Sequence, residues 1–464
     1  MTSETILINP QIFREYDIRG IVDRDLSTDF AYLLGRAYAT LAKEHGKDRI
    51  AVGHDCRHSS EPYARALLSG LSDEGVSGIY TGLGPTPQVY YSLFNRDYGG
   101  GIQVTGSHNP SNMNGFKMCL GQSGLAGDAI QDLRARMSDL AGTAPTAPAS
   151  GEIHEQDLHR EYVDDLITRV KPHMGSRKVK VVVDAGNGMG GVTGPEVLRG
   201  IGADVVELYG EPDGRFPNHH PDPTVMEYLE DLITKVRETG ADIGIGWDGD
   251  ADRIGAVDEQ GNVIFGDMLL LLFARAILEE VPKATIIGDV KCSSVMFDDL
   301  RQRGANAVMY KTGHSLIKHK LKELNGELGG EMSGHIFFKH RFYGFDDAVY
   351  ASARLIEILS KTDKPASELL ADLPPRVSTP EIRVECPDEI KFEIAARAQK
   401  AFPEFATETI DGVRISFAKG WGLIRASNTQ PVLVMRFEAE TSKDLEAYRS
   451  LTAERVEQIK AALR

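Results

Sequence analysis

Short runs of β-branched residues that end in glycine-rich turns set the limits on the architecture of this chain. The run KVKVVVDAGNG at 178–188 predicts a strand and a tight turn, followed by a helix at 195–202 and another strand at 203–210. The segments 49–55 and 284–291 have the same pattern. Strand, turn, helix and strand in this order are typical of βαβ units, so we expect an α/β protein with mostly parallel sheets.

The pattern occurs three times, and each time the first strand ends at an acidic residue, at Asp55, Asp184 and Asp289. In each repeat a later strand ends in an unusual polar loop. These loops are TGSHNP at 105–110, DGDADR at 248–253 and GEMSGH at 330–335. Ligand sites in parallel α/β sheets lie beyond the carboxyl ends of the strands. We therefore predict three related α/β domains, each of which contributes one loop to a shared cleft.

Two breaks in composition indicate where domains end. The segment 141–150 contains small residues and prolines and reads as a linker, and three prolines at 372–380 end the preceding helix. Strand-like and helical stretches at 375–464 suggest a different, α+β domain. The expected domains are 1–150, 151–257, 258–371 and 372–464.

The amino-acid composition indicates which binding partners and which cellular compartment to expect. Asp and Glu outnumber Lys and Arg by 68 to 52, and the formal net charge of -16 argues against binding to nucleic acid or to an anionic membrane. The most apolar stretch, 267–278, contains Asp267 and Arg275 and predicts a buried helix instead of a membrane span. Residues 1–10 lack the pattern of a signal peptide, and the four cysteines lack metal-binding spacing. We expect a soluble, cytoplasmic protein with reduced thiols.

The loop at 248–253 predicts a metal site. Asp248, Asp250 and Asp252 repel one another unless a cation lies among them, and their oxygens suit Mg²⁺. A solvated acidic turn is the alternative. An EF-hand is rejected, because Arg253 occupies the position that requires glycine and because the flanking segments read as strands. Arg253 is better suited to clamp a phosphate.

The loop at 105–110 presents a candidate nucleophile. Ser107 follows a predicted strand, and a nearby cation would activate its hydroxyl. His108 and Lys117 would neutralise charge that develops during phosphoryl transfer. The alternative is a structural turn. A serine hydrolase is not proposed, because the chain lacks the G-x-S-x-G elbow.

The loop at 330–335 combines a carboxylate, a hydroxyl and an imidazole. Glu331, Ser333 and His335 alternate, so an extended loop would place all three on one side. Such a set suits sugar hydroxyls, and His335 is a candidate acid or base near neutral pH. A polar edge loop without ligand is the alternative.

A fourth polar loop lies between two strand-like runs near the C-terminus. Arg425, Ser427, Asn428 and Thr429 would form a cradle for an anion, and a decorated hairpin turn is the alternative. Weaker candidates for ligand contacts are Tyr16, Arg19, Lys291, Lys311 and His314.

The motifs TGSHNP, DGDADR, GEMSGH and RASNTQP, in this order and across essentially the whole chain, resemble those of the α-D-phosphohexomutase superfamily. The resemblance implies four domains around a central cleft, three of them related and the fourth similar to the TATA-binding protein. It implies that Ser107 carries a phosphate and that Asp248, Asp250 and Asp252 bind Mg²⁺ together with it.

The same resemblance assigns the remaining residues by role. GEMSGH resembles the loop that recognises the sugar, and RASNT the loop that binds its distal phosphate. The implied charge-stabilising or acid/base residues are Arg19, His108, Lys117, Arg253 and His335. The implied substrate contacts are Tyr16, Lys291, His314, Glu331, Ser333, His335, Arg425, Ser427, Asn428 and Thr429.

The amino-acid sequences of the loops are most similar to those of the bacterial phosphomannomutase/phosphoglucomutase group. The implied reaction interconverts hexose 1-phosphate and hexose 6-phosphate through a phosphoserine and a hexose 1,6-bisphosphate. The alternatives are a phosphoglucosamine mutase, which more often has Gln where Met332 stands, a metal-dependent sugar phosphatase, and a non-catalytic sensor of sugar phosphates. The expected partners are hexose phosphates, and the expected state is a monomer or weak homodimer.

Overall fold

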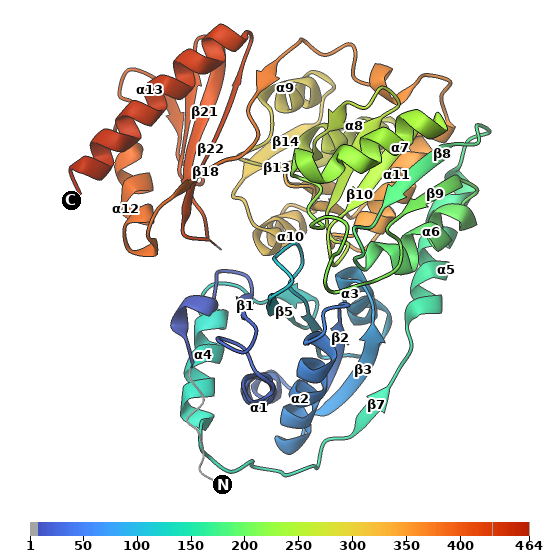
Figure 1. The fold of residues 1–464 in the computed structure, drawn as a ribbon, viewed down its shortest axis with the longest axis vertical. Coiled ribbons are helices and arrows are strands. Elements are labelled where there is room, and N and C mark those ends of the chain that lie inside the picture. Colours follow the sequence, from blue (N-terminus) through green and yellow to red (C-terminus); the bar gives the residue numbers. More distant parts are fainter. Residues whose placement is uncertain (1–7, 429, 464) are drawn as a thin grey trace.

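The computed structural model of this protein describes residues 8–428 and 430–463. Four sheets form four successive modules along the chain (Figure 1). Module I contains strands β1 to β7, module II β8 to β12, module III β13 to β16, and module IV β17 to β22. No helix in the described part of the chain has the length and hydropathy that crossing a bilayer requires.

Module I has a seven-stranded sheet with the strand order β1-β5-β4-β2-β3-β7, and β6 pairs with β5. β2 is parallel to both of its neighbours, whereas β5 is antiparallel to β4. The strands are β1 (Ile18–Ile21), β2 (Arg49–His54), β3 (Ser77–Leu83), β4 (Gly100–Val104), β5 (Met113–Leu120), β6 (Ser123–Gly124) and β7 (Ile153–Glu155). The α-helices are α1 (Thr28–Glu44), α2 (Ser60–Asp73), α3 (Thr86–Asn95) and α4 (Asp128–Leu140), preceded by the 3₁₀ turn η1 (Pro10–Ile12).

Module II has a five-stranded sheet with the order β12-β11-β10-β8-β9, in which β8 is parallel to both neighbours. The strands are β8 (Lys180–Asp184), β9 (Asp204–Leu208), β10 (Ile243–Trp247), β11 (Ile254–Asp258) and β12 (Val263–Ile264). The helices are α5 (His159–Val170), η2 (Lys171–His173), α6 (Gly190–Gly200), η3 (Met226–Leu229) and α7 (Glu230–Thr239).

Module III has a four-stranded sheet with the order β14-β13-β15-β16, and β13 is parallel to both neighbours. The strands are β13 (Thr285–Asp289), β14 (Asn306–Tyr310), β15 (Leu328–Gly330) and β16 (Ile336–Phe338). The helices are α8 (Gly266–Glu280), α9 (Ser294–Gln302), α10 (His314–Glu323), α11 (Ala348–Ser360) and η4 (Ala366–Glu368).

Module IV has an antiparallel sheet with the order β17-β22-β21-β20-β19, and β18 also pairs with β22. The strands are β17 (Val377–Ser378), β18 (Ile382–Glu385), β19 (Ala406–Glu408), β20 (Val413–Phe417), β21 (Gly420–Ala426) and β22 (Val432–Ala439). Helices α12 (Asp388–Ala398) and α13 (Ser442–Ala461) pack against this sheet. The predicted α+β content of this segment is confirmed.

The repeat that the sequence predicts is present in modules I to III. In each module a parallel strand is followed by one that returns antiparallel to it, and these pairs are β4–β5, β10–β11 and β15–β16. The three polar loops connect these pairs, and the fourth connects β21 to β22. The first three loops therefore occupy equivalent strand ends, as the βαβ pattern predicted, and the fourth is a hairpin turn of the antiparallel sheet.

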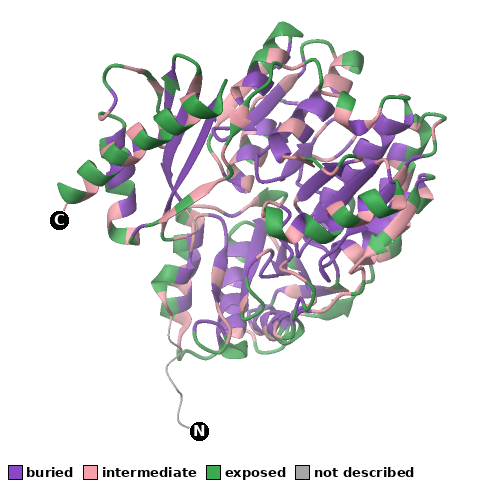
Figure 2. Ribbon diagram, turned by 45° about the horizontal axis from the view of Figure 1, so that its top comes forward, coloured by how far each residue is buried: buried purple, intermediate pink, exposed green. Residues whose placement is uncertain are grey.

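The hydrophobic core explains how the modules are joined. One buried cluster includes Tyr90 and Leu93 of α3, Leu166 of α5, Trp247 of β10 and Leu270 of α8, so it runs through modules I, II and III. Figure 2 shows the buried residues of the molecule in purple. Module IV has a separate core of its own. Modules I to III are thus held together by shared apolar burial, whereas module IV is attached mainly through polar contacts and a small cluster around Trp421.

Two elements differ from the expectations. The helix expected at 195–202 spans Gly190–Gly200, and its glycines Gly190 and Gly194 let the ring of Trp247 lie directly against it. The segment 141–150 is free of helix and strand, as predicted, but β7 follows it and pairs with β3 of module I. The expected boundary at residue 150 falls just before this strand.

Candidate active site

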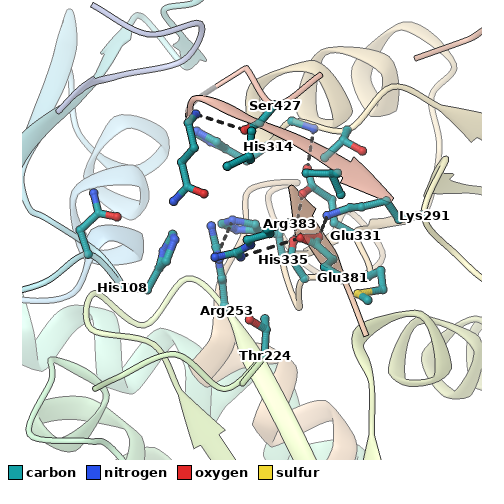
Figure 3. Close-up of a pocket in the computed structure, with 18 of the residues that line it drawn as sticks. His108, Thr224, Arg253, Lys291, His314, Glu331, His335, Glu381, Arg383 and Ser427 are labelled. Atoms are coloured by element: carbon teal, nitrogen blue, oxygen red, sulfur yellow. Dashed lines mark hydrogen bonds and ion pairs between the residues drawn. The ribbon is translucent and has the colours of Figure 1, made fainter. Parts of the chain in front are cut away.

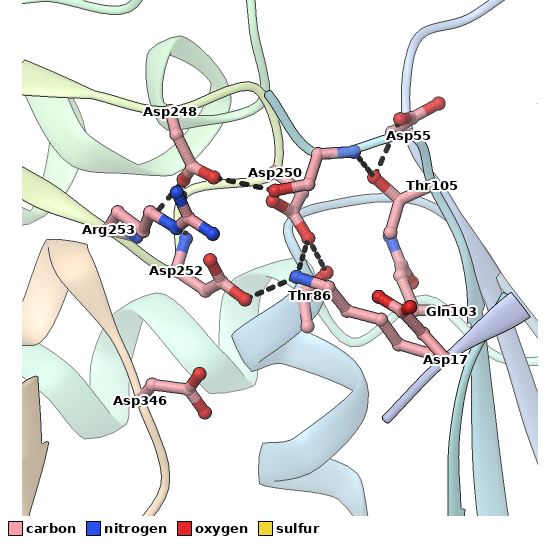
Figure 4. Close-up of polar contacts among 12 residues, drawn as sticks. Asp17, Asp55, Thr86, Gln103, Thr105, Asp248, Asp250, Asp252, Arg253 and Asp346 are labelled. Carbon is pink, nitrogen blue, oxygen red and sulfur yellow. Dashed lines mark hydrogen bonds and ion pairs between the residues drawn. The ribbon is translucent and has the colours of Figure 1, made fainter. Parts of the chain in front are cut away.

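The loop that carries Ser107 is held by buried charged groups beneath it. Ser107 has a positive φ of 48°, a conformation that non-glycine residues adopt rarely. Its backbone N–H donates to Thr105 Oγ1 at 2.8 Å, and Thr105 Oγ1 donates to Asp55 Oδ2 at 2.8 Å (Figure 4). Arg57 donates to the carbonyl oxygens of Ser107 at 2.8 Å and Asn109 at 2.6 Å. The loop is therefore fixed independently of any ligand.

The aspartate loop between β10 and β11 lies directly against the serine. Ser107 Oγ donates to Asp248 Oδ2 at 2.8 Å, and oxygens of Asp248, Asp250 and Asp252 lie within 4.8 Å of one another. All three carboxylates are buried. Lys117 Nζ donates to Asp250 Oδ2 at 2.6 Å and also to Asp252 Oδ2. Modules I and II thus meet at a hydroxyl, three carboxylates and one ammonium group.

The electrostatics of this cluster follow from burial and charge. Burial raises the pKa of Asp248 well above its usual range, and the charges of Asp250 and Asp252 raise it further. Burial acts against the charge of Lys117, but Asp250 and Asp252 outweigh it and raise the pKa of Lys117. For Asp250, burial is outweighed by Lys117, so its pKa is lowered. An added cation would favour the ionised form of Asp248.

The donor set fits a hard divalent cation. It consists of carboxylate oxygens and a hydroxyl, the ligands that Mg²⁺ prefers. In addition, Asp250 Oδ1 and Asp252 Oδ1 are buried, and neither has a hydrogen-bond partner within residues 8–428 and 430–463. Buried oxygens of this kind are costly unless a cation or another donor satisfies them.

The loop of module III is a turn, so the extended form that the sequence suggested is wrong. Gly334 has a φ of 94°, and its N–H donates to the carbonyl of Glu331 at 3.0 Å. The Glu331 carboxylate accepts from Gly313 N at 2.9 Å and from Ser333 Oγ at 3.1 Å. The turn nevertheless brings Glu331, Ser333 and His335 to the same cavity.

His335 and Arg253 join modules II and III. Arg253 Nε donates to His335 Nε2 at 2.9 Å (Figure 3), and the two residues also form an isolated antiparallel bridge. His335 Nδ1 lies 3.0 Å from Asp346 Oδ2. The ring of His314 stacks on that of His335 with 5.6 Å between centroids. Burial lowers the pKa of His314 well below its usual value, and the charge of Lys318 lowers it further.

The loop of module IV reaches module I through Tyr16. Asn428 Nδ2 donates to Tyr16 Oη at 2.6 Å, and the same hydroxyl donates to the carbonyl of Thr312 at 2.9 Å. Arg425 Nε donates to Asp411 Oδ2 at 3.0 Å. Ser427 Oγ accepts from the backbone N–H of Gln430 at 3.1 Å. Thr429, the last predicted residue of this loop, lies outside the described residues.

Two further predicted cations are anchored by carboxylates. Lys291 Nζ donates to Glu381 Oε1 at 2.7 Å (Figure 3), and Arg19 Nε donates to Asp17 Oδ2 at 2.6 Å. Burial raises the pKa of Glu381, but Lys291 outweighs this effect and the pKa is lowered to about 2. The Lys291 ammonium and the Arg19 guanidinium therefore stay charged, and both residues line the same cavity.

A cavity of about 800 Å³ lies among the four loops. The predicted residues that line it are Tyr16, Arg19, His108, Lys117, Arg253, Lys291, His314, Glu331, Ser333, His335, Arg425 and Ser427. Ser107 is buried beside the cavity, with Oγ 3.2 Å from His108 Nδ1. Lys311, in contrast, is exposed and does not line the cavity.

The residues that the sequence did not single out are mostly the partners of the predicted ones. Arg57 holds the serine loop, Thr86 Oγ1 donates to Asp250, Asp346 faces His335, Glu381 faces Lys291, and Asp411 binds Arg425. Of these, Arg57 alone had a local signal, because it follows the acidic strand end at Asp55. The others are isolated polar residues whose roles depend on contacts distant in sequence.

Four family models match the chain in the order of its modules. Their descriptions are phosphoglucomutase/phosphomannomutase α/β/α domain I at residues 10–140, domain II at 160–261, domain III at 265–377, and the C-terminal domain at 381–455. The matches cover most of the chain and include all four polar loops.

Individual proteins give the same result. A phosphomannomutase/phosphoglucomutase of Pseudomonas putida is 46% identical over 437 residues, which are 94% of this chain and 93% of that protein. A phosphoglucomutase of Neisseria gonorrhoeae is 45% identical and covers 95% of each chain. The crystal structure of a phosphoglucomutase/phosphomannomutase family protein from Burkholderia thailandensis superposes with a TM-score of 0.89 at 39% identity and covers 98% of each chain.

Proposed function

The chain belongs to the phosphoglucomutase/phosphomannomutase family and is a phosphohexomutase, and from this premise we propose how its residues perform the reaction. Ser107 carries the phosphoryl group that moves between the 1- and 6-positions of mannose and glucose phosphates. The observation that supports this role most directly is the 2.8 Å contact between Ser107 Oγ and Asp248 Oδ2, because it joins the candidate nucleophile to the acidic loop.

Asp248, Asp250 and Asp252, with an oxygen on Ser107, would hold Mg²⁺. When bound, the ion withdraws charge from the transferring phosphoryl group and screens the three carboxylates from one another. The two buried oxygens without hydrogen-bond partners, Asp250 Oδ1 and Asp252 Oδ1, support this assignment.

The basic side chains would act on the transferring group. In the forward step the bond between phosphorus and Ser107 Oγ breaks while a bond to a sugar hydroxyl forms, and the hydroxyl proton leaves to a base. Arg19, Lys117 and Arg253 provide positive charge at this end of the cavity. Burial lowers the pKa of His108 well below its usual value, and the charge of Arg253 lowers it further, so its imidazole is neutral beside Ser107 and would act through hydrogen bonds.

The opposite end of the cavity would hold the phosphate that does not react. Arg425, Ser427, Asn428 and Thr429 would bind it, and Tyr16 would contact it from module I. Lys291, His314, Glu331, Ser333 and His335 would contact the sugar. The intermediate would be a hexose 1,6-bisphosphate that reverses its orientation inside the cavity, so the one distal site must accept the phosphate at either sugar position.

We place the enzyme in the cytoplasm as a monomer or weak homodimer, without nucleic-acid or membrane partners. Four cysteines free of disulfides and the net charge of -16 support this placement. Sedimentation at micromolar concentration would test the oligomeric state.

The decisive experiment removes the phosphate carrier. Ser107→Ala is expected to lower mutase turnover by at least about 10⁴-fold, since without the hydroxyl the covalent route is closed. Ser138→Ala on the exposed face of α4 is the matched control and should leave kcat/KM unchanged. Full turnover of Ser107→Ala without added bisphosphate would disprove the proposal.

The substrate class is tested in the same assays. Mannose 1-phosphate, glucose 1-phosphate and glucosamine 1-phosphate are compared by kcat/KM, and inorganic phosphate is measured in parallel. Isomerisation of the first two without phosphate release is the expected result. Preference for the amino sugar would favour a phosphoglucosamine mutase, and stoichiometric phosphate release would favour a phosphatase.

A further inference from the structure

Arg383 lines the cavity from module IV, and neither the polar loops nor the proposed reaction accounts for it. Its backbone, in β18, pairs with that of Val434 in β22. On its other side Val434 pairs with Arg425 of β21. Residues that lie directly opposite one another in an antiparallel sheet point to the same face. Arg383, Val434 and Arg425 therefore form one row across the sheet, and all three line the cavity.

The alternation of side chains along β18 agrees with this placement. Ile382 and Val384, on either side of Arg383, pack against the core of module IV. Arg383 consequently points away from that core, to the face that carries Arg425. Two inter-strand spacings separate the Cα atoms of the two arginines, which places them roughly 10 Å apart. They can therefore contact different parts of one ligand.

The guanidinium of Arg383 is held more loosely than the neighbouring cations. Its one ion pair within residues 8–428 and 430–463 is with Glu381, at 3.8 Å between Nη2 and Oε2 (Figure 3). Its side chain is 43% exposed, whereas those of Lys291 and Arg425 are 4% and 6% exposed. A partly exposed pair at this distance is weak, so the Arg383 side chain can move with a ligand at little cost.

Glu381 shows that these cations act on a common region. Burial raises the pKa of Glu381, but the charges of Lys291, Arg383 and Arg425 together lower it to about 2. The Glu381 oxygen that binds Lys291 at 2.7 Å is Oε1, and the oxygen nearest to Arg383 is Oε2. The carboxylate is thus already matched to Lys291, and the charge of Arg383 is available to an anionic ligand.

The proposed reaction requires the cavity to hold a ligand that moves. Both phosphates of the hexose 1,6-bisphosphate must leave their sites while the sugar reverses its orientation. The cations at those sites are fixed, because Arg425 Nε donates to Asp411 at 3.0 Å and Arg19 Nε donates to Asp17 at 2.6 Å. A fixed cation cannot follow a phosphate in transit, whereas a loosely held arginine on the wall of the cavity can.

We propose that Arg383 binds a phosphate of the hexose 1,6-bisphosphate while this intermediate reverses its orientation, and thereby retains it in the cavity between the two transfer steps. The inference rests on the proposed function, because that function supplies the bisphosphate. Arg383 acts here as a binding residue, and neither a proton nor a phosphoryl group passes through it.

The first test measures how strongly Arg383→Ala depends on added bisphosphate. Each time the intermediate escapes, it takes the phosphate with it and leaves Ser107 as a free hydroxyl, so turnover stops until bisphosphate is supplied. We expect Arg383→Ala to slow progressively on glucose 1-phosphate alone. It should need about tenfold more glucose 1,6-bisphosphate than the wild type for half-maximal rate, the effect of one lost charge-assisted contact. At saturating bisphosphate its kcat should remain close to that of the wild type.

A single-turnover experiment measures retention directly. Phosphorylated enzyme is mixed with glucose 1-phosphate, and glucose 1,6-bisphosphate in the filtrate and the phosphorylated fraction of the protein are determined by mass spectrometry. Arg383→Ala should release more bisphosphate than the wild type, and Arg383→Lys, which keeps the charge, should release less than Arg383→Ala. Arg397→Ala is the matched control. It removes another half-exposed arginine of module IV that pairs with one carboxylate, that of Glu393, outside the cavity lining, and it should behave as the wild type.

Equal release of bisphosphate by Arg383→Ala and the wild type would overturn the inference, and so would equal release by Arg383→Lys and Arg383→Ala. A lower kcat of Arg383→Ala at saturating bisphosphate, with unchanged release, would instead place Arg383 in the transfer step and would also overturn it. Failure of the proposed function is distinguishable, because the wild type would then not isomerise glucose 1-phosphate even with added bisphosphate.

Discussion

At the residue scale, several buried charges in this protein hold backbone in place instead of contacting ligand. Arg57 is 3% exposed and donates to four carbonyl oxygens of the serine loop, those of Ser107, Asn109, Pro110 and Met113, while Nε donates to Asp55. Five N–H groups in a planar fork match this task, and no other side chain provides them. The unusual φ of Ser107 is stabilised by this network.

Arg57→Lys should therefore damage catalysis although it conserves the charge. Lysine has three donors on one nitrogen and cannot reach carbonyls on opposite sides of the loop, so Ser107 loses its fixed orientation. We expect kcat to fall by about 10- to 100-fold with the fold retained. Steady-state kinetics with circular dichroism as the control would measure this, and wild-type kcat in the lysine variant would contradict it.

Asp347 predicts a pH dependence of stability. Burial raises its pKa from 3.8 to about 7, although it accepts hydrogen bonds from Tyr350 N and Tyr162 Oη. The folded state thus binds the proton more tightly than the unfolded state. The stabilisation by this proton is complete below the unfolded pKa and is lost as pH rises through 7, at up to about 1.4 kcal/mol per pH unit.

Asp347→Asn keeps an acceptor oxygen for the helix N-terminus but does not titrate. Its unfolding temperature should therefore rise relative to that of the wild type as pH increases from about 5 to 8. Calorimetry at several pH values would measure the difference. If the two profiles ran parallel over this range, the carboxyl of Asp347 would have an ordinary pKa.

The sequence predicted the residues that gather at the candidate site better than the residues that support them. Ser107 and the three aspartates lie in loops at strand ends, where local pattern and βαβ topology both point to a site. Asp346 and Asp411 belong to no periodic pattern. Their partners, His335 and Arg425, lie elsewhere along the chain, so their significance appears only once the modules have packed.

At the element scale, the site depends on how closely two loops approach. A Cβ atom added at Gly249, within the aspartate loop, would lie 2.4 Å from the carbonyl oxygen of Ser107, and backbone cannot yield as a side chain can. The same closeness lets the Ser107 hydroxyl reach Asp248.

Sequence reasoning identified both loops, but the extended form it gave to the loop at 330–335 was wrong, because Gly334 turns the backbone there.

Gly249→Ala should separate the serine loop from the aspartate loop. We expect kcat to fall by about 100-fold or more, because a displacement of about 1 Å is costly in phosphoryl transfer. Gly304→Ala, at a positive φ of 85° in open space, is the control that should cost about 1 kcal/mol of stability and leave kcat intact. Wild-type activity of Gly249→Ala would show that the loops need not touch.

The dependence of turnover on a metal ion is also a property of the serine loop and the aspartate loop. Excess EDTA should abolish turnover, and Asp250→Asn should lower it by about 10³-fold, because the loop then lacks a charged ligand oriented by Thr86 and Lys117. After EDTA treatment, added Mg²⁺ should restore the activity of the wild-type enzyme but not that of Asp250→Asn. Undiminished rates in EDTA would remove the metal from the proposed reaction.

At the scale of the whole molecule, module IV contacts module I through individual side chains beside the cavity. Arg14 forms an ion pair with Asp388 at 3.1 Å between modules I and IV, with side chains 22% and 30% exposed, so we assign it about 1 kcal/mol or less. Tyr16 Oη joins Thr312 of module III to Asn428 of module IV. Module III, in contrast, holds module IV through buried contacts such as those of Arg414 with the carbonyl oxygens of Val290 and Cys292. The cavity can therefore open for the substrate on the side of module I.

Tyr16→Phe should weaken the contacts that close the cavity without lowering the stability of the individual modules. Loss of two hydrogen bonds, each worth about 1 kcal/mol, should raise KM by about tenfold or more and change kcat less. Tyr32→Phe, which removes a hydrogen bond to Asp73 inside module I, is the control with unchanged KM. An unaltered KM in Tyr16→Phe would mean that the hydroxyl does not contribute to the bound state.

The pairing of β7 with β3 affects how the polypeptide can be divided for expression. A fragment that stopped at the proline-rich stretch would leave the N–H and C=O groups of β3 unpaired along a bare sheet edge, a surface that invites intermolecular strand pairing and precipitation. A cut placed after Glu155 keeps that edge covered by its native neighbour. Soluble recombinant pieces of this enzyme should therefore be sought with termini beyond the last strand of the first sheet.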